Sequence, residues 1–280
     1  MWPLDLLTPS DWLHCSRRSV ERWGVVSQGR RLISAHELDQ KGSPSASELA
    51  DGMKAVLKGA QGARIELMLD TCWLPLLLLD TGESLLSADQ LDALVRHRLG
   101  LLYTRETGTA GSWATRVDHQ AGERYALGTG LSSDIDAALR TAAQTVGVRW
   151  GALLPSFAWA WRQLRPDRIW PRSSGGKGWF VWRESDRTLI GLFERGRLAA
   201  FNPGAPPSNS DAEIDGLIAA ETLRWGLEPR NLPVTVASWS TVDAPGGNAT
   251  GRSTRWIHIA SDAGAWPARS GVEQAAEVPA

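Results

Sequence analysis

The stretch from residue 63 to residue 80, ARIELMLDTCWLPLLLLD, holds the two apolar runs that most constrain the fold. One run covers residues 64–69 and the other residues 73–79, and each has the length of a β-strand. The break between them, Asp70-Thr71-Cys72, predicts a hairpin turn that joins two neighbouring strands. Several later segments have the pattern of elements that would pack onto this pair, so we expect the pair to organise the fold.

Strand-like and helix-like segments alternate along the rest of the chain. Paired strands are predicted at residues 23–27 and 31–38, and again at 113–117 and 124–127, with a three-stranded meander over 179–201. Single buried strands are predicted at 148–154 and 233–237. Serines in N-cap positions predict helices that begin after Ser45, Ser87, Ser132 or Ser133, and Ser210. A strand hairpin followed by alternating helices and strands thus occurs twice, which predicts an α/β protein of two related lobes.

The loop after residue 164, rich in Pro, Ser and Gly, is the best internal boundary. We expect residues 1–165 to form a first α/β lobe with a lead-in over 1–22, which includes a helix cap near Thr8. Residues 166–240 then form a second, abbreviated lobe. Residues 241–280 are a Gly-, Ala- and Ser-rich tail, predicted to be largely disordered apart from a short strand near 256–259.

Composition excludes several classes of function. Thirty basic and thirty-one acidic residues leave a net charge of -1, which provides no general attraction to nucleic acid or anionic lipid. The longest apolar run contains Pro75 and is too short to cross a bilayer, and the first residues lack a basic flank. Two cysteines make neither a disulfide framework nor a metal site. We therefore expect a cytoplasmic protein without a signal peptide, a membrane span or a metal.

Fifteen tryptophans accompany only two tyrosines and four phenylalanines. They could act as stacking platforms for sugars or bases, but they follow no repeat period, and we expect most of them to fill core and interface positions. The alternative function that they leave open is a Trp-rich enzyme or a carbohydrate-binding protein.

No motif in the chain specifies a reaction. The sequence Gly128-Thr129-Gly130 follows a strand and opens a helix, but the third glycine of a dinucleotide fingerprint is missing. Residues 175–178, GGKG, lead into a strand instead of a helix, unlike a phosphate-binding loop. Both are interpreted as turns. Acidic residues stand at predicted strand ends, where a metal-dependent nuclease could use them, although turns favour such residues too: Asp70, Asp80, Asp118 and Glu184.

The order of these segments resembles the actin-like proteins of pilus and secretion assembly platforms: the PilM-like proteins of type IV pili and the cytoplasmic domain of GspL-like type II secretion proteins. The resemblance rests on RIELMLDTCWLPLLLLD (64–80), LDALVRHRLGLLY (91–103), WATRVDH (113–119), YALGTGLSSDIDAAL (125–139), VRWGALLPSFAWAWRQL (148–164) and GWFVWRESDRTLIGLFERGRL (178–198). It implies a two-lobed actin-like (RNase H-like) architecture with mixed sheets flanked by helices.

In actin-like ATPases, a glycine-containing turn in each lobe holds the nucleotide phosphates. The resemblance places these turns at residues 70–73 and 184–187, so Asp70, Thr71 and Asp186 are the residues that would contact such a ligand. Neither turn contains glycine, and backbone amides approach phosphate closely only where side chains are absent. We therefore expect no cofactor and no catalysis. A nucleotide-binding actin-like ATPase is the first alternative.

The resemblance then implies a cytoplasmic scaffold that binds a membrane subunit's tail or an assembly ATPase, and that reaches the inner membrane only through that partner. Its oligomeric state is open. In a helix over 155–164, Trp159 and Trp161 would lie about 200° apart, so one core face cannot take both. Trp161 precedes Arg162 and Arg165, and tryptophan beside arginine is typical of binding hot spots. We expect these four residues to contact the partner, unless the second lobe covers them.

Overall fold

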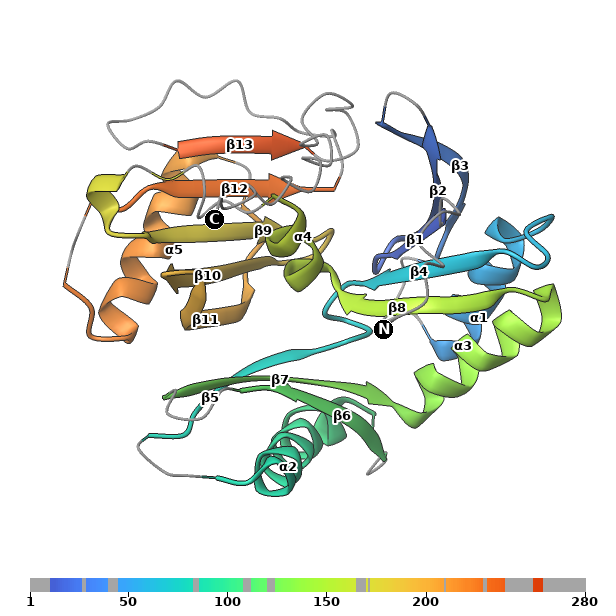
Figure 1. The fold of residues 1–280 in the computed structure, drawn as a ribbon, viewed down its shortest axis with the longest axis horizontal. Coiled ribbons are helices and arrows are strands. Elements are labelled where there is room, and N and C mark those ends of the chain that lie inside the picture. Colours follow the sequence, from blue (N-terminus) through green and yellow to red (C-terminus); the bar gives the residue numbers. More distant parts are fainter. Residues whose placement is uncertain are drawn as a thin grey trace, which may run out of the picture.

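The computed structural model describes residues 11–26, 29–39, 45–82, 86–107, 112–119, 124–164, 170, 172–208, 210–228, 231–239 and 254–258. Two five-stranded sheets form two lobes, and a three-stranded sheet lies beside them (Figure 1). The α/β class, with mixed sheets flanked by helices, agrees with the prediction.

The first lobe has the strand order β3-β2-β1-β4-β8. Helices α1 and α3 pack side by side on one face of this sheet (Figure 1). Its elements are β1 (Asp11–Cys15), β2 (Ser19–Val26), β3 (Gly29–Glu37), α1 (Ala46–Val56), β4 (Arg64–Leu69), α3 (Ser133–Val146) and β8 (Arg149–Pro155).

The second lobe has the order β11-β10-β9-β12-β13, with helix α5 on its outer face (Figure 1). Its elements are β9 (Lys177–Arg183), β10 (Thr188–Glu194), β11 (Arg197–Ala205), α5 (Asp211–Arg224), β12 (Val234–Ser238) and β13 (Thr254–His258), after a short 3₁₀ turn, η2 (Arg172–Ser174).

The two large sheets repeat one topology. In each, the central strand pairs antiparallel with the strand after it and parallel with the strand that follows the lobe's helix. Strand β1 therefore occupies the position that β9 has in the second lobe, and β4 the position of β12. The strand expected near residues 256–259 is present as β13, which pairs parallel with β12.

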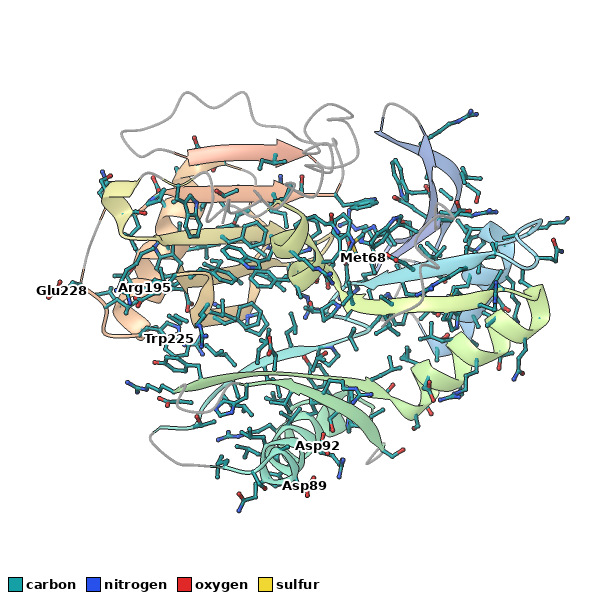
Figure 2. All side chains as sticks on the ribbon, in the orientation of Figure 1. Met68, Asp89, Asp92, Arg195, Trp225 and Glu228 are labelled. Atoms are coloured by element: carbon teal, nitrogen blue, oxygen red, sulfur yellow. The ribbon has the colours of Figure 1, made fainter. Side chains whose placement is uncertain are left out.

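The third sheet, with order β5-β7-β6, is inserted between β4 and α3 of the first lobe. Helix α2 (Ala88–Thr107) covers one face of β5 (Leu76–Asp80), β6 (Trp113–Asp118) and β7 (Tyr125–Ser132). Figure 2 shows Asp89 and Asp92 on this helix, away from the two large sheets. A Cβ atom at Gly128 or Gly130 would lie 2.4 Å from Val95 or 2.2 Å from Leu99. Close packing of α2 thus explains these glycines without a dinucleotide.

The predicted hairpin at residues 64–80 is wrong. A turn does follow Asp70, whose carbonyl oxygen accepts hydrogen bonds from the amides of Trp73 and Leu74. The strands on either side separate, however, because β4 pairs in parallel with β1 and β8, while β5 pairs with β7. Partners far along the chain decide this pairing, and a local pattern does not reveal them.

The prediction for the lead-in, residues 1–22, is also corrected in part. Residues 11–15 form β1, the central strand of the first sheet, instead of the start of a helix. Residues 1–10, with the helix cap predicted at Thr8, lie outside the described residues. Of the helices in the described ranges, none combines the length and apolar character needed to cross a bilayer.

Each lobe has a core between its sheet and its helices, and a third core joins the lobes. The outer faces of the two sheets pack against α1 and α3, and against α5. The inner faces enclose the short helix α4 (Ser156–Leu164), which connects β8 to β9. Aromatic side chains dominate this inter-lobe core, with Met68 contributed by β4 (Figure 2). Most described tryptophans are buried in these cores, as expected: Trp12, Trp23, Trp73, Trp159, Trp170, Trp179, Trp182 and Trp239.

Candidate functional site: a cavity between the two lobes

A cavity of about 670 Å³ lies where the ends of the two central strands meet. The turn between β1 and β2 and the residue after β4 line it from the first lobe. The turn between β9 and β10 and the end of β12 line it from the second. The repeated topology explains this, because equivalent strand ends of the two lobes face the same space. The cavity has the size of a small-molecule site.

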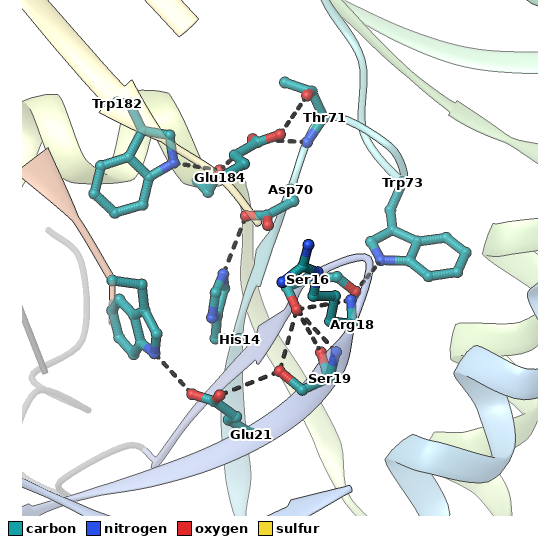
Figure 3. Close-up of polar contacts among 12 residues, drawn as sticks. His14, Ser16, Arg18, Ser19, Glu21, Asp70, Thr71, Trp73, Trp182 and Glu184 are labelled. Carbon is teal, nitrogen blue, oxygen red and sulfur yellow. Dashed lines mark hydrogen bonds and ion pairs between the residues drawn. The ribbon is translucent and has the colours of Figure 1, made fainter. Parts of the chain in front are cut away.

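The first turn is closed by the side chain of Ser16. Its hydroxyl oxygen accepts hydrogen bonds from the backbone amides of Arg18 (3.1 Å) and Ser19 (2.9 Å), as Figure 3 shows. Its carbonyl oxygen accepts a hydrogen bond of 2.9 Å from the indole of Trp73. Both amides are thereby used within the turn. Ser16 also fixes the turn to the segment after β4.

The second turn is fixed to the first lobe by Glu184. Its carboxylate accepts bonds from the amide of Thr71 (2.9 Å), the hydroxyl of Thr71 (2.6 Å) and the hydroxyl of Ser156 (2.9 Å). The indole of Trp182 donates in turn to Ser156 (3.0 Å). Burial raises the pKa of Glu184 well above its usual range, and the nearby charge of Asp70 raises it further. This carboxyl therefore binds a proton more readily than an exposed glutamate.

A buried ion pair lies at the back of the cavity. The Nε2 atom of His14 is 3.0 Å from Oδ1 of Asp70, and the two residues are 4% and 2% exposed (Figure 3). Burial alone would lower the pKa of His14, but the charge of Asp70 and the hydrogen bond to it produce a net rise. His14 therefore binds a proton more readily than an exposed histidine.

A second ion pair crosses between the lobes. Asp186 accepts a bond of 2.9 Å from Arg17 in the first turn and one of 3.0 Å from Arg187 in its own turn. Burial would raise the pKa of Asp186, but the hydrogen bonds from the two arginines produce a net fall. The contact between the lobes at Asp186 is thus an ion pair, whereas the donors to Glu184 are neutral groups.

The structure brings together the three residues that the sequence identified as contacts for a nucleotide. Asp70 and Asp186 both line the cavity, and Thr71 bonds to Glu184 beside it. One assignment is corrected: the turn that corresponds to residues 184–187 is the β1–β2 turn at residues 16–18, because β1 and β9 occupy equivalent positions. That turn also lacks glycine.

Of the four acidic residues expected at strand ends, only two belong to this cavity. Asp70 and Glu184 line it, whereas Asp80 pairs with Arg124 on the surface and Asp118 lines a different cavity. No group of three His, Cys, Asp or Glu side chains in the described ranges could hold a metal ion.

The residues predicted to contact a partner have separate locations. Trp159 is fully buried in the inter-lobe core, which corrects its assignment to a surface, because the second lobe covers it. Trp161 is half-buried and stacks on Phe193 with ring centroids 3.4 Å apart. Arg162 is exposed. Arg165 lies outside the described residues.

Several cavity residues were not predicted: His14, Ser16, Glu21 and Trp239. Glu21 accepts hydrogen bonds from the indoles of Trp23 (3.1 Å) and Trp239 (2.9 Å), the second of which joins the lobes. Identifying β1 as a strand would have indicated His14, because its neighbour Cys15 pairs with Leu69, directly before Asp70.

No protein-family model matches this chain, and no curated protein matches its sequence. Three solved structures resemble it along most of its length. The PilM–PilN type IV pilus biogenesis complex has a chain with a TM-score of 0.53 and 11% identity, covering 89% of this chain and 88% of that one. The cytoplasmic domain of EpsL, an inner-membrane component of the type II secretion system of Vibrio cholerae, has a TM-score of 0.50 and 12% identity, covering 90% of both chains.

The third is a Bacteroides thetaiotaomicron protein with an actin-like ATPase fold and unknown function. It has a TM-score of 0.51 and 13% identity, and the match covers 84% of this chain and 83% of that one. Together these likenesses show an actin-like fold and confirm the predicted architecture and resemblance.

Proposed function

We propose that this chain is a non-catalytic scaffold in a pilus or secretion assembly platform, where it binds the cytoplasmic tail of a membrane subunit or an assembly ATPase. The fold supports this proposal, since it is shared along nearly the whole chain with PilM from a complex with PilN and with the cytoplasmic domain of EpsL. A protein of this kind would work at the cytoplasmic face of the inner membrane.

The observation that carries the proposal is the use of the turn amides within the protein. An actin-like ATPase needs free backbone amides in its turns to hold phosphates. Here the amides of Arg18 and Ser19 bond to Ser16, that of Glu184 bonds to the carbonyl oxygen of Arg187 at 2.9 Å, and that of Thr71 bonds to Glu184. A triphosphate would have to break these bonds and lie beside the carboxylates of Asp70 and Asp186.

We therefore expect millimolar Mg-ATP to leave the melting temperature unchanged. A nucleotide at about one hundred times its dissociation constant would stabilise the protein by about 2.7 kcal/mol. The measurement is a thermal unfolding scan with and without Mg-ATP. An upward shift that Asp70→Ala abolishes would overturn the proposal and favour the nucleotide-binding alternative, which the cavity volume of about 670 Å³ could accommodate.

We place the partner contact near the exposed end of α4, at Trp161 and Arg162. Trp161 lines a second cavity of about 320 Å³, together with Leu78 and Leu127 of the inserted sheet. Arg162, the next residue along α4, is exposed and suits an acidic peptide. A hollow lined largely by apolar side chains, with an exposed arginine next to Trp161 in the chain, resembles the core and rim of an interface.

Arg162→Glu is expected to weaken binding of the cytoplasmic tail of a pilus or secretion membrane subunit from the same organism by roughly tenfold or more. Because Arg162 is exposed, the melting temperature should not change. Arg149→Glu is the matched control, an exposed arginine at the opposite end of β8. Titration of the labelled tail measures both variants. Equal affinity in both would remove α4 from the proposed interface.

A further inference from the structure

Around the inter-lobe cavity, some polar groups have hydrogen-bond partners in the protein and others do not. Its four carboxylates, Glu21, Asp70, Glu184 and Asp186, each accept hydrogen bonds from the protein. Three other polar atoms on lining residues are buried and have no hydrogen-bond partner among the described residues: Nδ1 of His14, Oγ of Ser185 and Oγ1 of Thr188. The atoms left to pair at the cavity are therefore two hydroxyl groups, which can donate or accept, and the second ring nitrogen of His14, which donates when the ring is protonated.

These unpaired groups come from both lobes. His14 belongs to β1, whereas Ser185 and Thr188 belong to the β9–β10 turn and the start of β10. Buried polar groups without partners are rare in folded proteins, and three of them around one cavity indicate that something other than the protein completes the site. A group that enters between the lobes can reach both sides.

One cation at the cavity is not paired with an acidic side chain among the described residues. Arg18 lines the cavity, is exposed and forms no ion pair within the described part of the chain. The pKa of His14 behind it is raised by Asp70 despite burial, so this ring binds a proton more readily than an exposed histidine. A guanidinium binds a carboxylate through two parallel hydrogen bonds, which a single hydroxyl or amide cannot do.

The remaining surface is aromatic. The indoles of Trp182 and Trp239 line the same cavity, and Trp239 packs against His14 with ring centroids 4.8 Å apart. The amides of Arg18, Ser19, Thr71 and Glu184 are used within the protein, as described above. We therefore expect a planar monoanion to fit the available groups better than a phosphate.

We propose that the inter-lobe cavity binds a small organic carboxylate with an apolar body, held by Arg18, His14 and the hydroxyls of Ser185 and Thr188. The indoles contact the apolar body of the ligand, and the carboxylate bridges the two lobes. This role goes beyond that of a scaffold and does not depend on it, because the partner contact on α4 lies elsewhere.

The test uses acetate, succinate and benzoate as probes in calorimetric titrations of the full chain at constant ionic strength, with chloride and inorganic phosphate as reference anions. We expect saturable binding of at least one carboxylate, strongest for benzoate, and none of phosphate. Arg18→Gln should weaken that binding roughly tenfold or more, because a charge-assisted hydrogen-bond pair is lost. Arg149→Gln, at the far end of the sheet, should bind as the wild type does.

Thr188→Val separates a binding role from a structural one. It replaces an unpaired buried hydroxyl by a methyl group of the same shape, so its melting temperature without ligand should be unchanged or higher. Its affinity for the carboxylate should nevertheless fall. The inference is overturned if none of the three carboxylates binds, or if Arg18→Gln and Thr188→Val bind them as tightly as the wild type does. Neither result affects the proposed function, which is tested separately by the Mg-ATP scan and by titration of the membrane-subunit tail.

Discussion

At the scale of single residues, two buried groups between the lobes bind protons more tightly in the folded state than in the unfolded state. The pKa of Glu184 is raised by burial and by Asp70, and that of His14 is raised by Asp70 despite burial. A group whose pKa is raised by folding stabilises the protein below its unfolded pKa, and this contribution is lost as the pH rises through the folded pKa. The unfolded values are about 4.3 for glutamate and about 6.5 for histidine.

Stability is therefore expected to fall as the pH rises from about 5 towards 8. Glutamine is neutral at every pH, so the free energy of unfolding of Glu184→Gln should decrease less over this pH range than that of the wild type. Asp51→Asn is the matched control, since Asp51 is an exposed residue of α1. Denaturant unfolding of each variant at several pH values measures the slope. If Glu184→Gln keeps the slope of the wild type, the raised pKa of Glu184 is refuted.

Trp159 is one of the largest fully buried side chains of the inter-lobe core, and it forms edge contacts with Trp12 and Trp239. Trp159→Ala should lower the free energy of unfolding by about 3–5 kcal/mol, because it leaves a large cavity. Trp113→Ala, at a half-buried position on the edge strand β6, should lower it less. Chemical denaturation of both variants makes the comparison. Equal losses would show that Trp159 does not occupy a tightly packed core.

At the scale of elements, local signals in the sequence located the helices and hairpins well. Ser45 and Ser210 each form a capping box, and Ser132 accepts a bond from the amide of Ile135, as N-caps do. The β2–β3 and β6–β7 hairpins and the β9–β11 meander were predicted correctly, since each pairs neighbouring strands. In all these cases the residues that determine the element are close together in the chain.

The elements that were missed depend on distant partners. Strand β1 is short and buried on both faces, so it lacks the alternating pattern of a half-buried strand. Its identity as a strand follows from β4, fifty or more residues later. The candidate site was only partly predictable for the same reason. Asp70, Thr71 and Asp186 are implied by the resemblance to actin-like proteins, but His14 lies on the strand that was missed.

Strand β13 allows a test at this scale. It pairs parallel with β12, and Ile257 is buried in the inter-lobe core. A chain that ends after residue 259 should keep its melting temperature, because the later residues have too little apolar content to offset the entropy lost on ordering them. A chain that ends after residue 253 should melt at a lower temperature. Thermal unfolding scans of both truncated chains test this. A large drop in the melting temperature of the chain that ends after residue 259 would show that the later residues contribute to the fold.

At the scale of the whole molecule, the two lobes are joined by one aromatic core and by polar contacts around one cavity. The bonds of Thr71 to Glu184, Arg17 to Asp186 and Glu21 to Trp239 all cross between the lobes within this region. The division of the chain near residue 165 remains a prediction. The structure adds that α4 lies at this point of the chain, with its apolar residues buried between the two sheets.

The repeated strand order has a consequence for assembly. Two half-length chains, each with one such sheet, would have to meet in solution before the space between them existed. In a single chain the second half is always present at a high effective concentration, so the pairing does not depend on dilution. The halves are then free to differ, and in the described part of the chain the first has an inserted sheet that the second lacks. The two ends of the molecule therefore differ in structure, so a larger assembly that contains it can bind each end through a different surface.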